Sequence, residues 1–364
     1  MTTVAEEPAP VRSQDRPRKP SVVQSIWRSY FLRRLVRALL MIWLVATLVF
    51  FMVRLMPGNP VDTYTAKLIA EQGLSYEQAR AQAATLFQFD SSKPLVLQYV
   101  DYLRNLLHGD MGTSIVSSGT TVASKIAAHL PWTMFSVGIS MVIAIGIGLV
   151  FGMIMAYRRG GIFDHAVSII GSLLHAIPNY LLAMLIVVVG GVKLKLFDFA
   201  QMRGSLTAGV KPGFTLNFIQ DIFYHAALPI LTYVLTTAGT WALVMKSSTT
   251  QVLGEDYVTV ARARGLSGGR IAGTYVGRNA VLPLVAQIAT QAGFVVGGAI
   301  FVEQTFAYDG IGIQLYKSIN FRDYPIIQGI LLMITIVVIF ANLLADFIYS
   351  FLDPRIRTDE RKAD

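Results

Sequence analysis

Six apolar runs dominate this sequence, and each is long enough to cross a lipid bilayer as a helix. A helix needs about 20 residues to span the hydrocarbon core, because it rises about 1.5 Å per residue. Backbone polar groups find no water in that core, so a long apolar span folds as a helix. The sequence therefore predicts an all-α polytopic membrane protein with six transmembrane helices, over Leu35 to Met56, Trp132 to Tyr157, Asp164 to Val192, Ala226 to Met245, Leu284 to Phe306 and Ile326 to Phe351.

The composition agrees with membrane insertion. Hydrophobic residues make up 54% of the chain and charged residues 15%, and the mean hydropathy is +0.53. Soluble domains carry about a quarter charged residues. The net charge of +9 is explained by basic cytoplasmic loops and anionic lipid headgroups, so no nucleic-acid partner is predicted. The chain has no cysteine, which excludes disulfides, thiolate nucleophiles and cysteine metal sites.

Basic residues at the ends of the runs predict the orientation. Cytoplasmic segments of membrane proteins carry an excess of Lys and Arg. Arg33, Arg34 and Arg37 crowd the start of the first run, and Arg355 and Arg357 follow the last. Both termini are therefore predicted to be cytoplasmic. Arg54, near the other end of the first run, can extend its long side chain to the membrane surface.

The alternation of polar and apolar segments divides the chain. Polar segments 1–27 and 352–364 are predicted to be cytoplasmic tails, the first of them disordered. Residues 28–56 hold the first transmembrane helix, and 57–131 form an external helical subdomain with amphipathic stretches at Ser75 to Gln88 and Pro94 to Leu107. Residues 132–351 are a five-helix transmembrane core, in which Pro178 bends the third run.

The segment 252–283 joins the fourth and fifth runs on the predicted cytoplasmic side and reads as helix, turn, helix. Glu255 and Asp256 suit the positive end of a helix dipole, and Gly265 can adopt the left-handed conformation that ends a helix. Ser267 can cap the second helix. A short helix with small alanines and a basic edge fits a protein groove. An amphipathic helix lying on anionic lipid is the alternative.

The sequence lacks three common motifs for nucleotide binding, zinc binding and nucleophilic catalysis. It contains no G-x-x-x-x-G-K-[ST] phosphate loop, no H-E-x-x-H zinc pair and no G-x-S-x-G elbow. Residues 266–270, LSGGR, look like the signature of ABC ATPases, but without a phosphate loop they are predicted to form a turn. The chain is therefore expected to bind no metal and to hydrolyse no ATP by itself.

Polar residues within apolar runs mark a candidate pore, because burying them in lipid is costly. Gln287 and Gln291 are four residues apart and can instead bond to a neighbouring helix, so both interpretations stay open. Asp346 is expected to pair with a nearby Arg. The candidate pore-lining residues are Gln287, Thr290, Gln291, Gly298 and Asn342.

Several motifs in order resemble one family. The pattern A-x-A-x-G-L at 261–266, followed by R-N-x-x-L-P at 278–283, resembles the EAA loop of ABC importer permeases. The segments FLRRLVRALL, MPGNPVD, KPLVLQYVDYLRNLLHGDMGTSI, GGAIFVEQTF, GIGIQLY, RDYP and LLADFIYSFLDPRIR resemble the dipeptide/oligopeptide importer permeases. The resemblance covers about residues 30 to 357. Lys246, where the family has Arg, and Gly268-Gly269 depart from its pattern.

The resemblance implies a type I ABC importer permease fold in a prokaryotic inner membrane. It implies a second homologous permease subunit, two ATP-binding subunits or one fused ATPase chain, and an extracytoplasmic substrate-binding protein. ATP and Mg would be bound by the partner subunits, and this chain would bind no cofactor. Contact with the ATPase is assigned to Glu255, Asp256, Tyr257, Ala261, Arg262, Ala263, Arg264 and Gly265.

The cargo implied by the resemblance is di- and oligopeptides, with nickel or another small solute as the alternative. A secondary transporter that works without ATPase subunits is the competing class. Such transporters tend to have internal repeats or a charged relay at mid-membrane, and the sequence shows neither clearly.

Overall fold

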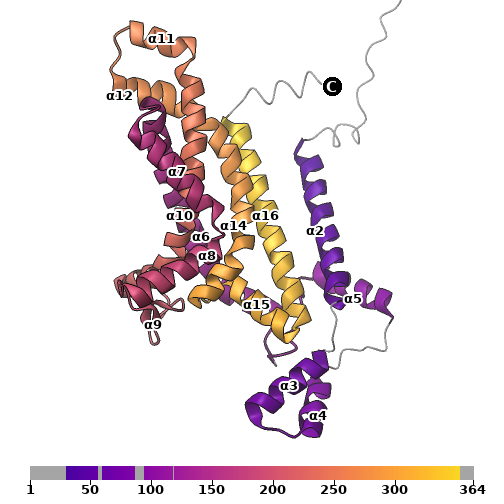
Figure 1. Ribbon diagram of the computed structural model, residues 1–364. Coiled ribbons are helices and arrows are strands. Elements are labelled where there is room, and N and C mark those ends of the chain that lie inside the picture. Colours follow the sequence, from indigo (N-terminus) through magenta and orange to yellow (C-terminus); the bar gives the residue numbers. More distant parts are fainter. Residues whose placement is uncertain (1–29, 56–59, 87–93, 118, 353–364) are drawn as a thin grey trace, which may run out of the picture. The chain divides into compact units, whose positions relative to one another are not determined.

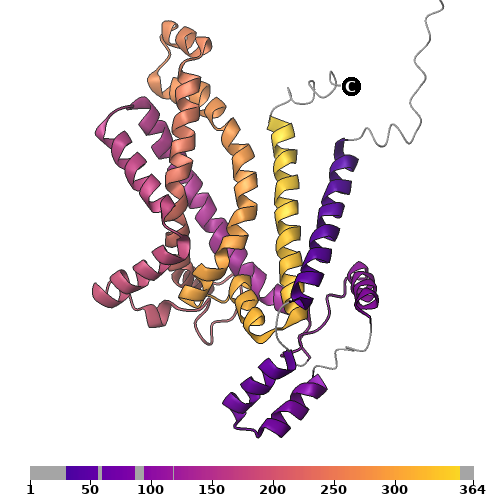
Figure 2. The same cartoon turned by 45° about the vertical axis from the view of Figure 1, so that its right-hand side comes forward.

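The computed structural model describes residues 30–55, 60–86, 94–117 and 119–352 (Figures 1 and 2). Within these ranges the regular structure is helical, apart from one isolated antiparallel bridge between Thr113 and Thr121. The predicted tail 1–27 lies outside the described residues, as does the predicted tail 352–364 apart from Leu352, which ends the last helix. The chain divides into two compact units between Leu44 and Val45, and the contacts that build the site all lie in the second unit.

Four helices in the described ranges are long and apolar enough to cross a membrane. They contain most of the first, second, fourth and sixth predicted runs. A fifth span is counted if the bent pair of helices in the third run is one crossing. The prediction of six spans is thus supported for four or five, and the four helices are α2 (Tyr30–Arg54), α6 (Val122–Tyr157), α10 (Leu216–Leu253) and α16 (Tyr324–Leu352).

Two of these helices begin about ten residues before the predicted spans at Trp132 and Ala226, so each helix is longer than the predicted crossing that it contains. The hydroxyl of Thr121 accepts a hydrogen bond from the backbone N–H of Ser124 at 3.1 Å and caps α6. Thr215 caps α10 in the same way. Pro131 lies inside α6 rather than at a boundary, because one missing backbone bond does not end a helix that is capped and packed along its length.

The third apolar run is broken, so a single helix from Asp164 to Val192 is also wrong. Helix α7 (Ile162–Ala176) ends before Pro178, and α8 (Asn179–Leu185) follows and continues as the π-helix η1 (Ile186–Lys193). The two halves meet at 101°. Proline disfavours helical backbone in the residue before it, and Ile177 is extended, with φ −81° and ψ 124°. Pro178 therefore ends the helix instead of bending it.

Glycines let the central helices pack closely. A Cβ atom at Gly148 of α6 would lie 2.3 Å from the Cβ of Trp241 on α10. A Cβ atom at Gly171 of α7 would lie 2.8 Å from the Cα of Gly239 on α10. Small residues at such crossings bring backbones together in membrane proteins, where dispersion contacts hold helices to one another. Helix α10 is therefore the element around which α6 and α7 are arranged.

Shorter helices occupy the predicted external connections. Helices α4 (Tyr76–Leu86) and α5 (Leu95–Leu107) lie within the two predicted stretches. Helix α3 (Pro60–Gln72) lies outside both predicted stretches, and it begins at a proline because proline at a first helical position loses no hydrogen bond. Helices α9 (Phe199–Met202) and α15 (Ile311–Phe321) were missed as well.

Candidate functional site

The connection from α10 to α14 (Leu282–Phe306) has the predicted helix, turn and helix shape (Figure 1). It consists of α11 (Asp256–Ala263), α12 (Gly268–Arg270), the π-helix η2 (Ile271–Gly277) and α13 (Arg278–Ala280). Gly265 has φ +74°, as predicted, and its N–H donates to the carbonyl of Arg262 at 2.9 Å. Glycine is needed at this position because other residues rarely adopt that conformation.

Ser267 differs in detail from its predicted role. It occupies the N-cap position of α12, and its carbonyl accepts from the N–H of Ile271 at 3.0 Å. Its hydroxyl makes no capping hydrogen bond. The LSGGR segment is therefore a turn into a helix, as predicted, but one formed by backbone geometry.

The loop has a small hydrophobic core of its own. Val258 and Ala261 of α11 are buried against Ile271 and Val276 of η2. Ala261 is 2% exposed, so it packs inside the loop and is not on the outer surface of α11. The second half of the loop therefore supports α11, in addition to leading the chain back to α14.

The outer surface of α11 carries the remaining predicted coupling residues. The exposed members of that set are Glu255, Asp256, Tyr257, Arg262, Ala263, Arg264 and Gly265. Val260, 49% exposed, lies among them and was not predicted. The hydroxyl of Tyr257 accepts from the Asn279 side chain at 3.2 Å, which ties α11 to the R-N pair before α14. The loop thus presents a braced surface with polar, basic and apolar side chains.

Hydrogen bonds and an ion pair connect the loop to the helices below it. The Ser248 hydroxyl on α10 donates to the carbonyl of Ala280 at 2.7 Å. Two residues earlier on α10, Lys246 Nζ lies 2.5 Å from Asp164 Oδ1 at the start of α7. Asp164 also accepts from the N–H of Gly160 at 3.0 Å. A displacement of the loop would therefore reach α10 and α7 together.

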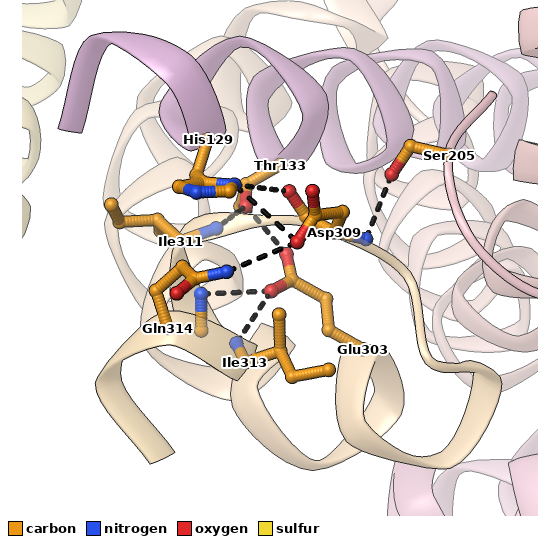
Figure 3. Close-up of polar contacts among 9 residues, drawn as sticks. His129, Thr133, Ser205, Glu303, Asp309, Ile311, Ile313 and Gln314 are labelled. Atoms are coloured by element: carbon orange, nitrogen blue, oxygen red, sulfur yellow. Dashed lines mark hydrogen bonds and ion pairs between the residues drawn. The ribbon is translucent and has the colours of Figure 1, made fainter. Parts of the chain in front are cut away.

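A second polar cluster lies at the other end of α14, around Glu303 (Figure 3). This carboxylate is 1% exposed. It accepts from the Thr133 hydroxyl on α6 at 2.5 Å and from the backbone N–H groups of Gly312 and Ile313 at 2.8 and 3.1 Å. The first N–H groups of a helix have no partner within it and favour negative charge. Glu303 therefore holds the first turn of α15.

Neighbouring residues shape the space around this carboxylate. A Cβ atom at Gly310 would lie 2.1 Å from Glu303 Oε1, so the glycine leaves room for the side chain. Thr133 accepts from the N–H of Ile311 at 2.8 Å while it donates to Glu303. The amide of Gln314 donates to Asp309 Oδ1 at 3.0 Å. Sequence reasoning matched the motifs that contain Glu303 and Gly310 but did not single out either residue.

Comparison with known proteins identifies the family. The family model described as binding-protein-dependent transport system inner membrane component matches residues 148–358. A putative peptide permease protein of Brucella suis is 34% identical over 328 residues, which are 90% of this chain and 98% of that protein. The chain belongs to the inner membrane components of binding-protein-dependent transport systems.

Two further relatives are named as permease proteins of peptide transport systems. The oligopeptide transport system permease protein AppB of Bacillus subtilis is 30% identical over 90% of this chain and 99% of its own length. The dipeptide transport system permease protein DppB of Escherichia coli K12 is 30% identical over 86% of this chain and 94% of its own length. The resemblance inferred from the motifs is confirmed, and the chain is a membrane permease subunit rather than an ATPase.

The predicted pore residues of this permease are only partly described. Gln287 lines a small pocket with His175, Thr237, Thr240 and Trp241. Asn342 is exposed on α16. The position of Gln287 among other polar groups is compatible with either a pore or a helix contact, so its pore role stays a prediction. The side chains of Thr290, Gln291 and Asp346, and the surroundings of Gly298, are outside what the structure describes.

Proposed function

We propose that this chain is the permease subunit of an ATP-driven importer of di- and oligopeptides, and that it forms the path together with a second homologous permease. A substrate-binding protein delivers the peptide, and separate subunits hydrolyse ATP. The observation that carries the proposal is the loop that presents α11. The loop has a core of its own and is bonded to α10 at Ala280, in a chain whose sequence has no phosphate loop. The printed names of the relatives support peptides as cargo.

The proposed topology has six crossings with both termini and the α10–α14 loop in the cytoplasm. Helix α14 supplies the fifth crossing, and the broken pair α7 and α8 the third. A break at Pro178 is acceptable within a membrane where neighbouring helices cover the freed backbone groups. Gly171 on α7 and Ala183 on α8 are both buried by neighbouring elements, which supports this assignment.

The proposed mechanism transmits work along contacts that the structure contains. When the ATP-binding subunits close, they displace α11, and the rigid loop core moves with it. The bond from Ser248 to Ala280 and the ion pair of Lys246 with Asp164 pass the displacement to α10 and α7. Helix α14 passes it to α15 through Glu303. The translocation path then opens alternately to one side of the membrane and to the other.

A substitution that adds a charge to the outer face of α11 tests whether this surface contacts the ATPase. Val260→Asp adds a carboxylate to an exposed site, so the chain folds and inserts normally, but the ATPase contact is disrupted. Peptide uptake by the reconstituted transporter is expected to fall at least about tenfold, since an interface anchor contributes about 2 kcal/mol. Ser267→Asp is the matched control, because it adds the same charge at an N-cap position that accepts Asp. Equal uptake by both variants would exclude α11 as the contact.

The cargo and the energy source need a separate experiment. Vesicles containing the assembled transporter and its binding protein are supplied with labelled dipeptide or with nickel, with and without ATP inside the cytoplasmic compartment. ATP-dependent uptake of the dipeptide is expected. Uptake of nickel alone would support the alternative cargo, and peptide uptake without ATP would support a secondary transporter.

A further inference from the structure

Helix α5 packs one face against the end of α2. The hydroxyls of Tyr99 and Thr47 are 2.7 Å apart, and the Arg54 Nε donates to the Gln98 side chain at 3.0 Å. The ring of Phe50 lies 5.3 Å from Tyr99 and 5.2 Å from the ring of Tyr102. These contacts place α5 beside the last two turns of α2.

A second face of α5 is apolar, and among the described residues it is largely uncovered, with Leu103 only partly exposed. Val96, Val100, Leu103 and Leu107 follow one another at spacings of four, three and four residues, so they form one stripe along the helix. Val96 is 70% exposed, Val100 53% and Leu107 88%. Within α5, all of which is described, no side chain is buried.

The third face of α5 is mainly polar, although Leu97, four residues before Asp101, also lies on it and is 53% exposed. Asp101, Asn105 and His108 share it, again at spacings of four and three residues. The helix thus has a protein face, an aliphatic face and a polar face. A helix that lies in the surface of a membrane has such an arrangement, with its apolar side in the acyl chains and its polar side in water.

The neighbouring span fixes the depth of α5. Helix α2 is long and apolar enough to cross the membrane, and its candidate membrane span ends at Arg54. Leu48 and Met52 near this end are exposed and therefore meet lipid in a membrane. The Arg54 guanidinium lies 3.9 Å from the centre of the Phe50 ring. Arginine and tyrosine side chains gather at the boundary between hydrocarbon and water, so Arg54, Tyr99 and Tyr102 mark that level.

We propose that α5 is an interfacial anchor, and that its stripe of Val96, Val100, Leu103 and Leu107 lies in the lipid leaflet that surrounds the Arg54 end of α2. The stripe has lipid as its occupant because α5 packs against the last two turns of α2, where Leu48 and Met52 are exposed. It is also purely aliphatic, whereas the centres of protein interfaces are enriched in aromatic residues, Met and Arg.

The anchor has a structural consequence for the permease. Residues 109–117 follow α5 directly, and the Ser114 hydroxyl and the Ile115 N–H donate to the carboxylate of Asp323. Asp323 lies between α15 and α16. The depth of α5 in the membrane therefore sets the position of a segment that binds the α15–α16 junction.

Fluorophores on adjacent positions of α5 test the proposal. Because the chain has no cysteine, Val100→Cys and Asp101→Cys each give one labelling site. The labelled chain, assembled in the full transporter, is reconstituted in vesicles that contain lipid with a nitroxide near the top of the acyl chain. We expect lipid quenching at position 100 to be at least about twofold stronger than at 101, and iodide in the water to quench in the opposite order.

Two results would overturn the anchor. Strong iodide quenching at both positions would show that the stripe faces water. Resistance of position 100 to both quenchers would show that another protein subunit covers it. Peptide uptake by each labelled transporter checks that it is folded, and Val96→Cys replaces Val100→Cys on the same stripe if that variant does not assemble.

Discussion

Glu303 is the residue whose surroundings explain most about the end of α14. It is buried, yet its two oxygens accept bonds from a hydroxyl on α6 and from two N–H groups of α15. Removing it leaves those donors in the interior without acceptors. A buried donor without a partner costs about 1–3 kcal/mol, so this side chain is a strong determinant of local structure.

Glu303→Ala is expected to destabilise the permease by roughly 1–3 kcal/mol or more, because it leaves several buried donors unpaired. Thermal unfolding of the detergent-purified chain measures the effect. Gln304→Ala is the control, since Gln304 is the exposed neighbour on the same helix. Gly310→Ala should resemble Glu303→Ala, because its Cβ would occupy the position of the carboxylate. If both variants melt like the control, Glu303 does not hold α15.

At the scale of elements, the loop between α10 and α14 behaves as a small folded unit. The predicted turn at Gly265 is correct, whereas the inward position of Ala261 could not be predicted. Alternation of small and charged residues shows where a helix lies, but which side faces inward depends on the partner. That partner is η2, about ten residues further along the chain.

Gly265→Pro is expected to uncouple the transporter, because proline cannot adopt a φ near +74°. Membrane insertion should be unaffected, since it depends on the flanking spans. Peptide-stimulated ATPase activity of the assembled transporter is the measurement. Gly268→Ala is a matched control: both glycines have open space around a Cβ atom, but Gly268 does not have a positive φ. Full stimulation in Gly265→Pro would contradict the assigned role of the turn.

At the scale of the whole molecule, the distribution of basic residues predicts the orientation in the membrane. In the sequence, α3 and α4 follow the first span, and the α10–α14 loop follows the fourth. Six crossings require these two segments to face opposite compartments. The family match places the chain in the inner membrane but leaves this orientation as a prediction.

Single cysteines in a cysteine-free chain test the orientation. Gln72→Cys, at the end of α3, should react with a membrane-impermeant maleimide on intact spheroplasts. Gly269→Cys, in the cytoplasmic loop, should react only after the membrane is permeabilised. Both positions are exposed, so access to the reagent depends on the side of the membrane. The unmodified chain should not react, and the reverse labelling pattern would invert the topology.

The amino-acid sequence by itself determined the all-helical membrane class, most of the spans, the loop with its left-handed Gly265 and the absence of a phosphate loop. Hydropathy, helix periodicity and turn chemistry are local properties, so a single sequence contains them. The tertiary structure decided the 101° break at Pro178, the inward side of α11 and the role of Glu303. These depend on distant partners: Thr133 meets Glu303 across 170 residues of sequence, and no local pattern records such a contact.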